Sequence, residues 1–230
     1  MIIKNNQNII GIKKTNTLIG KVYHNIDLVW EKIKRLPNEY QEVSYIETTG
    51  TQYIDTNFIP NNNTKIEVKY MITAIQTQMI FGCRTESNST RASNGVFITH
   101  RSAGTKVAWS KGTNTNVEIN GYNNINTQYT AFFDKNKVYI NNDLVRAFNY
   151  IEWAANYPMF IGCVNTAGST EYKTKGKYYG FKIWNENVLD RDLIPCYRKS
   201  DNVAGLYDIV NDVFYTNEGT GEFIVGEDVN

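Results

Sequence analysis

Polar and apolar residues alternate without a break in Lys65-Ile66-Glu67-Val68-Lys69-Tyr70-Met71-Ile72. Successive side chains of a β-strand point to opposite faces, so this pattern predicts a strand with one buried and one exposed face. Residues 177–184 alternate in the same way. There we expect one face to hold Tyr179, Phe181 and Ile183, and the other to hold Tyr178, Lys182 and Trp184.

The rest of the chain after residue 36 continues as short strands separated by turn residues. Two apolar runs that end in Gly-Cys, residues 78–83 and 158–163, are typical of strands in the centre of a sheet. Asn120-Gly121 predicts a two-residue hairpin, because both positions tolerate positive φ. Two further turns, at residues 134–136 and 141–142, bracket a strand over 137–140, and residues 187–194 could hold one helical turn. About a dozen short strands with polar turns predict an all-β protein, an antiparallel jelly-roll sandwich.

Composition and charge exclude several classes of function. The 230 residues include 24 basic and 23 acidic side chains, a net charge of +1 without long runs of one sign, so we expect no nucleic acid or anionic membrane as partner. No stretch approaches the roughly 18 apolar residues of a membrane span. Of the three cysteines, Cys83 and Cys163 lie in apolar runs, which predicts buried, reduced thiols and assembly in a reducing cytosol.

The first thirty residues contain a short repeat. Residues 3–11 align with residues 12–20, and residues 22–30 form a looser third copy. Three small strands cannot bury their apolar side chains by themselves, so these side chains need a partner surface. That surface is either another protein or the domain that follows; the side chains are Ile10, Ile19, Val29 and Trp30.

The chain is therefore expected to divide into a repeat segment with its linker, residues 1–35, and a sandwich, residues 36–230. The linker is the charged run Glu31-Lys32-Ile33-Lys34-Arg35. We expect no secretion signal, because Met1-Ile2-Ile3 is followed at once by Lys4-Asn5-Asn6.

The sequence offers little for catalysis or metal binding. Sandwich glycanases place two carboxylates at alternate positions of one strand, but Glu67 has no second acid two residues away. The two histidines, His24 and His100, show no arrangement with an acid and a nucleophile. We therefore expect no enzyme and no cofactor. Calcium would suit loop aspartates, but these more often cap turns and no metal is predicted for Asp55, Asp134 and Asp143.

Sugar binding would need exposed aromatic faces and polar groups that fix hydroxyls. The polar middle of the chain, where loops of a lectin would lie, supplies Arg101, Trp109 and Tyr122 as candidates. Trp109 follows Val107-Ala108, so membership of the core is the stronger interpretation for this residue.

Two stretches resemble the ends of a family of phage and prophage proteins. The opening motif is Leu36-Pro37-Asn38-Glu39-Tyr40 followed by Tyr45 to Thr56. The closing motif is Asp192 to Cys196, Gly205-Leu206-Tyr207-Asp208 and Phe214 to Gly221. Residues 137–145, 160–163 and 178–184 are similar to strands of laminin G-like domains. The resemblance implies a laminin G-like, concanavalin A-like jelly roll over residues 36–226.

What the resemblance implies for function is a virion appendage, without saying whether it belongs to the head or the tail. It would be a fibre or capsid decoration protein, assembled in the bacterial cytoplasm and present in the virion as a homo-oligomer. Residues 1–35 would bind other virion proteins, and the sandwich could bind a host-surface glycan. The alternatives are a lectin-type carbohydrate-binding module and, less favoured by the missing acidic motif, a glycan depolymerase.

Overall fold

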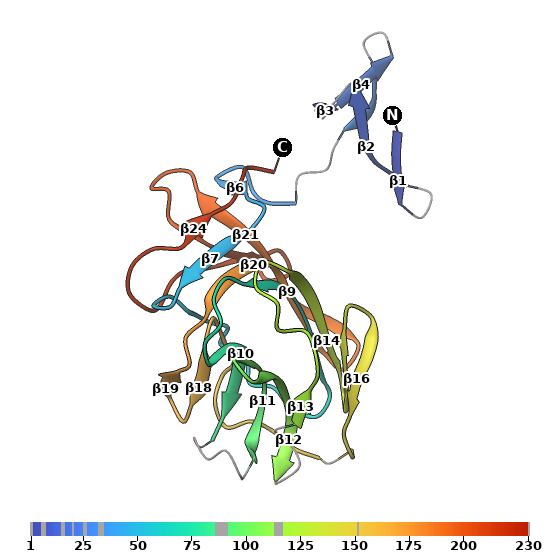
Figure 1. Cartoon of the computed structure of the whole chain (residues 1–230). Coiled ribbons are helices and arrows are strands. Elements are labelled where there is room, and N and C mark those ends of the chain that lie inside the picture. Colours follow the sequence, from blue (N-terminus) through green and yellow to red (C-terminus); the bar gives the residue numbers. More distant parts are fainter. Residues whose placement is uncertain are drawn as a thin grey trace.

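The chain is an all-β protein (Figure 1). The computed structural model describes the backbone of residues 2–5, 8–14, 17–19, 21–24, 27–31, 35–85, 92–112, 117–150 and 152–229. Side chains are described for residues 35–85, 95–109, 117–150 and 152–229. None of the described residues forms a helix that could cross a membrane.

The larger sheet has 11 strands in the described part of the chain. Its main path runs β16-β15-β14-β9-β20-β21-β22-β23. Off this path, β7 pairs with β20, β6 pairs with β21, and β24 pairs with β7. The strands are β6 (Tyr40–Glu42), β7 (Ile46–Thr49), β9 (Thr64–Ile72), β14 (Gln128–Asp134), β15 (Lys137–Ile140), β16 (Asp143–Ala147), β20 (Lys175–Asn185), β21 (Val188–Arg198), β22 (Ala204–Asp208), β23 (Val213–Tyr215) and β24 (Ile224–Val225).

The smaller sheet has 8 strands, with the path β13-β12-β11-β10-β17-β8. The strands pair antiparallel, except that β18 is parallel to β10. On its other side β18 pairs antiparallel with β19. The strands are β8 (Ile54–Asp55), β10 (Gln78–Arg84), β11 (Ala92–Arg101), β12 (Gly104–Gly112), β13 (Val117–Ile119), β17 (Phe160–Ile161), β18 (Val164–Thr166) and β19 (Ser169–Glu171).

The two sheets enclose one apolar core, which confirms the predicted antiparallel sandwich. Phe81 of the smaller sheet packs edge-on against two rings of the larger sheet, with centroid distances of 5.3 Å to Phe133 and 5.4 Å to Phe181. The Tyr178 hydroxyl donates across the layers to the Ile80 carbonyl at 2.7 Å. Apolar burial supplies most of the stability of such a core.

The two Gly-Cys runs lie side by side in the smaller sheet, where Gly82 of β10 is paired with Phe160 of β17. Cys83 and Cys163 are buried and free, as predicted, and so is Cys196. Burial raises the pKa of each thiol to about 12, so these cysteines stay protonated at neutral pH.

The opening and closing motifs contact each other. The Gln52 amide donates to the Glu222 carbonyl at 2.7 Å, and the Thr51 hydroxyl donates to the Thr220 carbonyl at 2.8 Å. Gly219 lies against the backbone of Thr51. A Cβ at Gly219 would be 2.1 Å from the Thr51 carbonyl oxygen, which explains why this position holds a glycine. Next to this contact, the Ser44 amide donates to the Glu227 carbonyl at 2.8 Å. We call this set of contacts between residues 43–53 and 217–229 the clasp.

Strand β9 has the predicted alternation, with buried and more exposed residues in turn from Thr64 to Ile72. In β20, the predicted division of faces is wrong, because a bulge shifts the register between Tyr178 and Gly180. A bulge inserts one residue and exchanges the faces beyond it. As a result, Tyr178, Phe181 and Ile183 are buried together, and Lys182 and Trp184 are on the opposite side.

Two other local predictions are wrong. Residues 188–198 form strand β21, paired with β20, instead of a helical turn. Asn120-Gly121 is a turn with Gly121 at φ +78°, but it joins β13 of the smaller sheet to β14 of the larger one and closes no hairpin. The turns at residues 134–136 and 141–142 do close the hairpins β14–β15 and β15–β16.

The repeat segment forms two small antiparallel sheets. One contains β1 (Ile2–Asn5), β2 (Asn8–Lys14) and β3 (Thr17–Ile19), and the other contains β4 (Lys21–His24) and β5 (Asp27–Glu31). Lys32, Ile33 and Lys34 of the predicted linker lie outside the described residues. The division of the chain at residue 35 stays a prediction.

Candidate functional site

The candidate site lies on the side of the larger sheet that faces away from the core, here called the outer face. In β9, Ile66 and Val68 are fully buried in the core, whereas Glu67 and Lys69 between and beside them point outward. In β14, Phe133 is buried and Phe132 is only partly buried. An aromatic residue at an outward position is unusual for a solvated strand face and needs an explanation.

Five outward side chains form a row across the strands, here called the cross-strand row. The register places Tyr139 of β15 opposite Phe132 of β14, and Phe132 opposite Glu67 of β9. Glu67 is opposite Lys182 of β20, which in turn is opposite Asp192 of β21. The row therefore changes from aromatic at one end to charged at the other.

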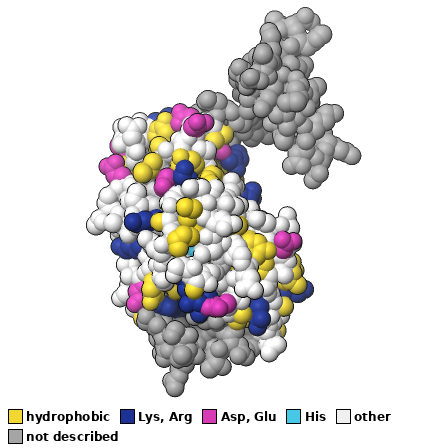
Figure 2. All heavy atoms as spheres, viewed as in Figure 1, with side chains coloured by type: hydrophobic (Ala, Val, Ile, Leu, Met, Phe, Trp, Pro, Cys, Tyr) yellow, Lys and Arg dark blue, Asp and Glu magenta, His cyan; other side chains and the backbone are white. Residues whose placement is uncertain are grey.

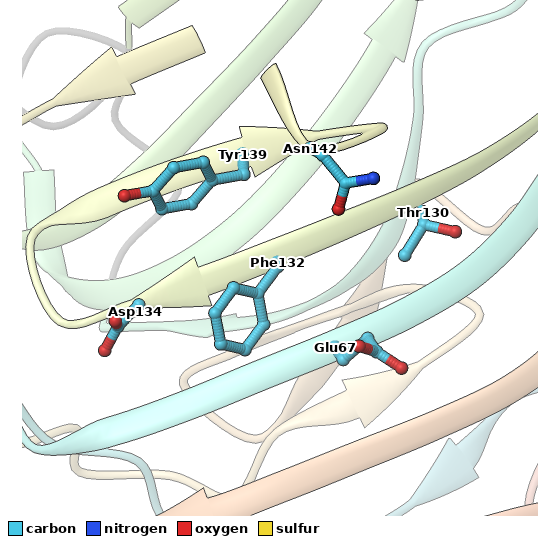
Figure 3. Close-up of a pocket in the computed structure, with 6 residues that line it drawn as sticks. All are labelled: Glu67, Thr130, Phe132, Asp134, Tyr139 and Asn142. Carbon is cyan, nitrogen blue, oxygen red and sulfur yellow. The ribbon is translucent and has the colours of Figure 1, made fainter. Parts of the chain in front are cut away.

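The aromatic end of the row lines a hollow of about 350 Å³, here called the first hollow (Figure 3). This volume lies within the range of about 300–1,000 Å³ that is usual for small-molecule sites. The rings of Phe132 and Tyr139 lie 6.3 Å apart, and Trp184 packs edge-on against Phe132 at 6.0 Å. The lining residues are Glu67, Thr130, Phe132, Asp134, Tyr139 and Asn142.

Local backbone geometry fixes the polar rim of the first hollow. Asn141 and Asn142 have φ of +52° and +72°, the conformation of a two-residue turn between right-twisted strands. The Asn141 amide oxygen accepts from the Thr130 backbone at 2.9 Å, which ties this turn to β14. The turn thereby holds Asn142 at the edge of the first hollow, where its side-chain amide lines the hollow.

The two carboxylates of the first hollow differ in their partners. Asp134 forms an ion pair of 3.1 Å with Lys65. Glu67 has no hydrogen bond or ion pair to any side chain that the structure describes. A partly buried carboxylate without a partner is a strong acceptor for hydroxyl groups of a ligand. Aromatic rings beside such acceptors are the combination that binds sugars, because the rings pack on C–H groups while the oxygens accept from hydroxyls.

A second, smaller hollow of about 120 Å³ continues from Glu67 toward β21. It contains the other end of the cross-strand row, where Lys182 and Asp192 form an ion pair of 3.3 Å. Tyr179 adds an aromatic ring, which packs edge-on against Tyr45 at 5.7 Å. Arg35 borders this second hollow and is paired with Glu42.

The sugar-binding residues predicted from the sequence lie elsewhere. Trp109 is only 2% exposed and packs edge-on against Trp153 at 5.1 Å, so it belongs to the core and has no face to offer a sugar. This corrects the prediction for Trp109, since its strand packs it inward.

Arg101 and Tyr122 are partly exposed and stay candidates, although neither lines the first or the second hollow. Arg101 is paired with Glu118, and Tyr122 has φ +56° in the connection between the sheets.

The predicted attachment residues lie in described strands, but their side chains are outside the described part of the chain. Ile10 is in β2 and Ile19 in β3, while Val29 and Trp30 are in β5.

His100 is buried in the core instead of forming part of a reactive site. Its Nε2 lies 2.8 Å from the Tyr70 hydroxyl, and its Nδ1 lies 3.0 Å from the Thr105 hydroxyl. Burial lowers the pKa of His100 to about 4, so the ring is neutral at physiological pH. His100 therefore acts as a hydrogen-bonded core residue.

Charged side chains of both signs are interspersed on the face shown in Figure 2, without a large patch of one sign. Among the described residues, no group of three or more His, Cys, Asp or Glu side chains could hold a metal ion. Neither Asp55 nor Asp143 joins Asp134 in such a group.

Comparison with known proteins gives structural neighbours only. No protein-family model matches the chain, and no curated protein sequence matches it. The carbohydrate-binding module CBM40 of the Ruminococcus gnavus IT-sialidase, bound to α2,3-sialyllactose, is 14% identical over 68% of this chain and 94% of the module, with a TM-score of 0.46. A second structure of the module is 13% identical over 68% of this chain and 95% of the module, with a TM-score of 0.45. These neighbours add no support to the resemblance to phage proteins.

Proposed function

We propose that this protein binds carbohydrate without cleaving it, and that the first hollow is its binding site. The observation that supports this most is the pair of outward rings, Phe132 and Tyr139, beside the unpartnered carboxylate of Glu67. A cross-strand pair of rings stabilises a sheet only modestly, whereas a sugar ring packed on them also removes apolar surface from water.

Binding is favoured over hydrolysis by the setting of the two carboxylates. A glycosidase needs one carboxyl group that is held protonated in a desolvated site. The Asp134 side chain is 34% exposed and paired with Lys65, which is the opposite setting. Glu67 alone cannot supply both the acid and the base or nucleophile. Incubation with a bound polysaccharide should therefore leave its chain length unchanged.

The test is a glycan array probed with the full chain, followed by titration calorimetry on the ligands found. Tyr139→Ala and Phe132→Ala should each weaken binding roughly ten-fold, since an aromatic contact is worth about 1 kcal/mol beyond area burial. Tyr150→Ala is the matched control, because Tyr150 is 55% exposed and lines neither hollow in the described part of the chain. Absence of any ligand at millimolar concentration, or equal loss in the control, would refute the proposal.

We further propose that residues 1–35 attach the protein to a larger assembly, a phage particle, in which it is a virion component in several copies. Two observations favour attachment: the sequence repeat, and its pairing into sheets of only three and two strands. Such small sheets are marginal in water, so they gain from a partner surface. Several copies would also strengthen weak glycan contacts by avidity.

Deletion of residues 1–34 tests the attachment and keeps Arg35, which borders the second hollow. The deleted protein should keep its glycan binding and fail to enter particles. Substitution of Ile10, Ile19, Val29 and Trp30 by serine in the full chain should have the same effect. Normal incorporation of either variant would refute the attachment proposal.

A further inference from the structure

Building on the proposed carbohydrate function, we propose that the ligand is an internal segment of a neutral, linear polysaccharide. The segment lies along the cross-strand row, from Tyr139 at one end to Asp192 at the other. A single terminal acidic sugar fits the geometry and the charges less well.

The site is long enough for several sugar rings. The first and second hollows adjoin at Glu67, which lines both, and are together called the groove; their lining residues come from β15, β14, β9, β20 and β21 and from Arg35 and Asn142. Neighbouring strands lie about 4.8 Å apart, so four steps between five strands give a groove of about 19 Å. One pyranose ring in an extended chain advances by a similar distance to one strand spacing. The groove therefore accommodates about four rings.

Aromatic rings lie in both hollows. Phe132 and Tyr139 line the first hollow, and Tyr179 lines the second, on the far side of Glu67. Rings in both hollows suit a ligand with more than one sugar unit, since each unit can pack on its own ring. Glu67 in the middle is placed to accept hydroxyl groups from the units between.

The charges of the first hollow disfavour an acidic sugar. The first hollow is lined by two carboxylates and by no basic side chain. Lys65 pairs with Asp134, and Glu67 forms no ion pair among the described residues, because its cross-strand neighbour Lys182 pairs with Asp192. An acidic sugar in the first hollow would meet the negative charge of Glu67 directly, and like charges in contact disfavour binding.

The second hollow offers little attraction to an acidic sugar. Lys182 is already paired with Asp192, and Arg35 is paired with Glu42. Lys69 is exposed, where water and salt screen its charge. The groove as a whole therefore favours a neutral chain.

The experiment is titration calorimetry of the full chain with two series of β-1,4-linked oligosaccharides, made of glucose and of N-acetylglucosamine. Each series contains the dimer, tetramer and hexamer, and α2,3-sialyllactose is the acidic probe. We expect at least one series to bind roughly ten-fold more tightly as tetramer than as dimer, with little further gain in the hexamer. Sialyllactose should bind more weakly than the tetramer.

Variants separate the two ends of the groove. Tyr139→Ala should weaken the binding of dimer and tetramer alike. Tyr179→Ala should leave the dimer unaffected and reduce the affinity of the tetramer to that of the dimer. Lys69→Ala tests the same end with a smaller structural change, and Tyr150→Ala is the control outside both hollows.

The outcomes distinguish this inference from the proposed function. Equal affinity for dimer and hexamer, or tighter binding of sialyllactose than of both tetramers, would overturn the inference and leave carbohydrate binding intact. Loss of tetramer binding in Tyr150→Ala, with none in Tyr179→Ala, would also overturn it. Failure of every glycan, on the array and in solution, would overturn the proposed function itself.

Discussion

Acid should destabilise the folded protein through His100. The ring is buried between the sheets, near the Tyr70 hydroxyl and with Nδ1 3.2 Å from the Asn123 amide oxygen. Burial lowers the pKa of His100 from 6.5 to about 4 in the folded state. Between these two values the unfolded chain binds a proton at this residue and the folded chain does not. Stability from this source is therefore present above pH 6.5 and is lost as the pH falls toward 4.

The size of the effect follows from the shift. One pKa unit corresponds to about 1.36 kcal/mol, so relative to pH 7 the loss is about 1 kcal/mol at pH 5.5 and about 3 kcal/mol at pH 4. Below pH 4 the folded protein also binds the proton, and this contribution stops changing.

The assay is urea unfolding at pH 7, 5.5 and 4, followed by tryptophan fluorescence, for the wild type and for His100→Gln. Glutamine does not titrate, so His100→Gln should be less stable at pH 7 but lose about 3 kcal/mol less than the wild type between pH 7 and pH 4. Carboxylates titrate in the same window and affect both proteins equally, which is why the difference is measured. The variant His24→Gln reports the contribution of the other histidine. Parallel stability curves for the wild type and His100→Gln would refute the argument.

Three further predictions concern the sandwich itself. Gln52→Ala should lower the free energy of unfolding by about 1–3 kcal/mol, because it removes the donor to Glu222 and leaves buried groups of the clasp unpaired; an unchanged urea midpoint would contradict this. Phe81→Ala should cost about 3–5 kcal/mol, because it leaves a cavity between the sheets, and its melting temperature gives the measure. A thiol reagent should modify no cysteine in the native protein and all three after denaturation; reaction before unfolding would argue against burial of Cys83, Cys163 and Cys196.

The fold could be predicted from the sequence where a strand keeps strict alternation. Residues 65–72 do so, and β9 buries the predicted face. The same reasoning was wrong for β20, because a bulge at Tyr178 and Gly180 shifts its pairing with β9. The isolated Gly180 inside the alternating run is the one sequence signal of this bulge. The residues predicted as a helical turn became β21 for a similar reason, since tertiary pairing overrides local preference.

The candidate site could not be predicted from local sequence, because its residues come from five strands. Tyr139 and Glu67 are 72 positions apart in the chain and meet only through the register of β15, β14 and β9. One local signal was available: Phe132 occupies an outward position in an alternating strand, where a polar residue would be ordinary. Trp109 lies in the polar middle of the sequence, but the apolar pair Val107-Ala108 before it agrees with its buried position in β12.

The clasp determines how the sandwich would respond to mechanical load. Val43 is bridged to Asp228, and the Val229 amide donates to the Glu42 carbonyl at 2.9 Å, so both flanks of the domain leave it at neighbouring points. Tension between these flanks would break the hydrogen bonds of the clasp one after another, so the clasp would open at low force. Tension between residue 36 and a ligand on the outer face would instead pass through β6, β21 and β20, where several backbone hydrogen bonds are loaded together.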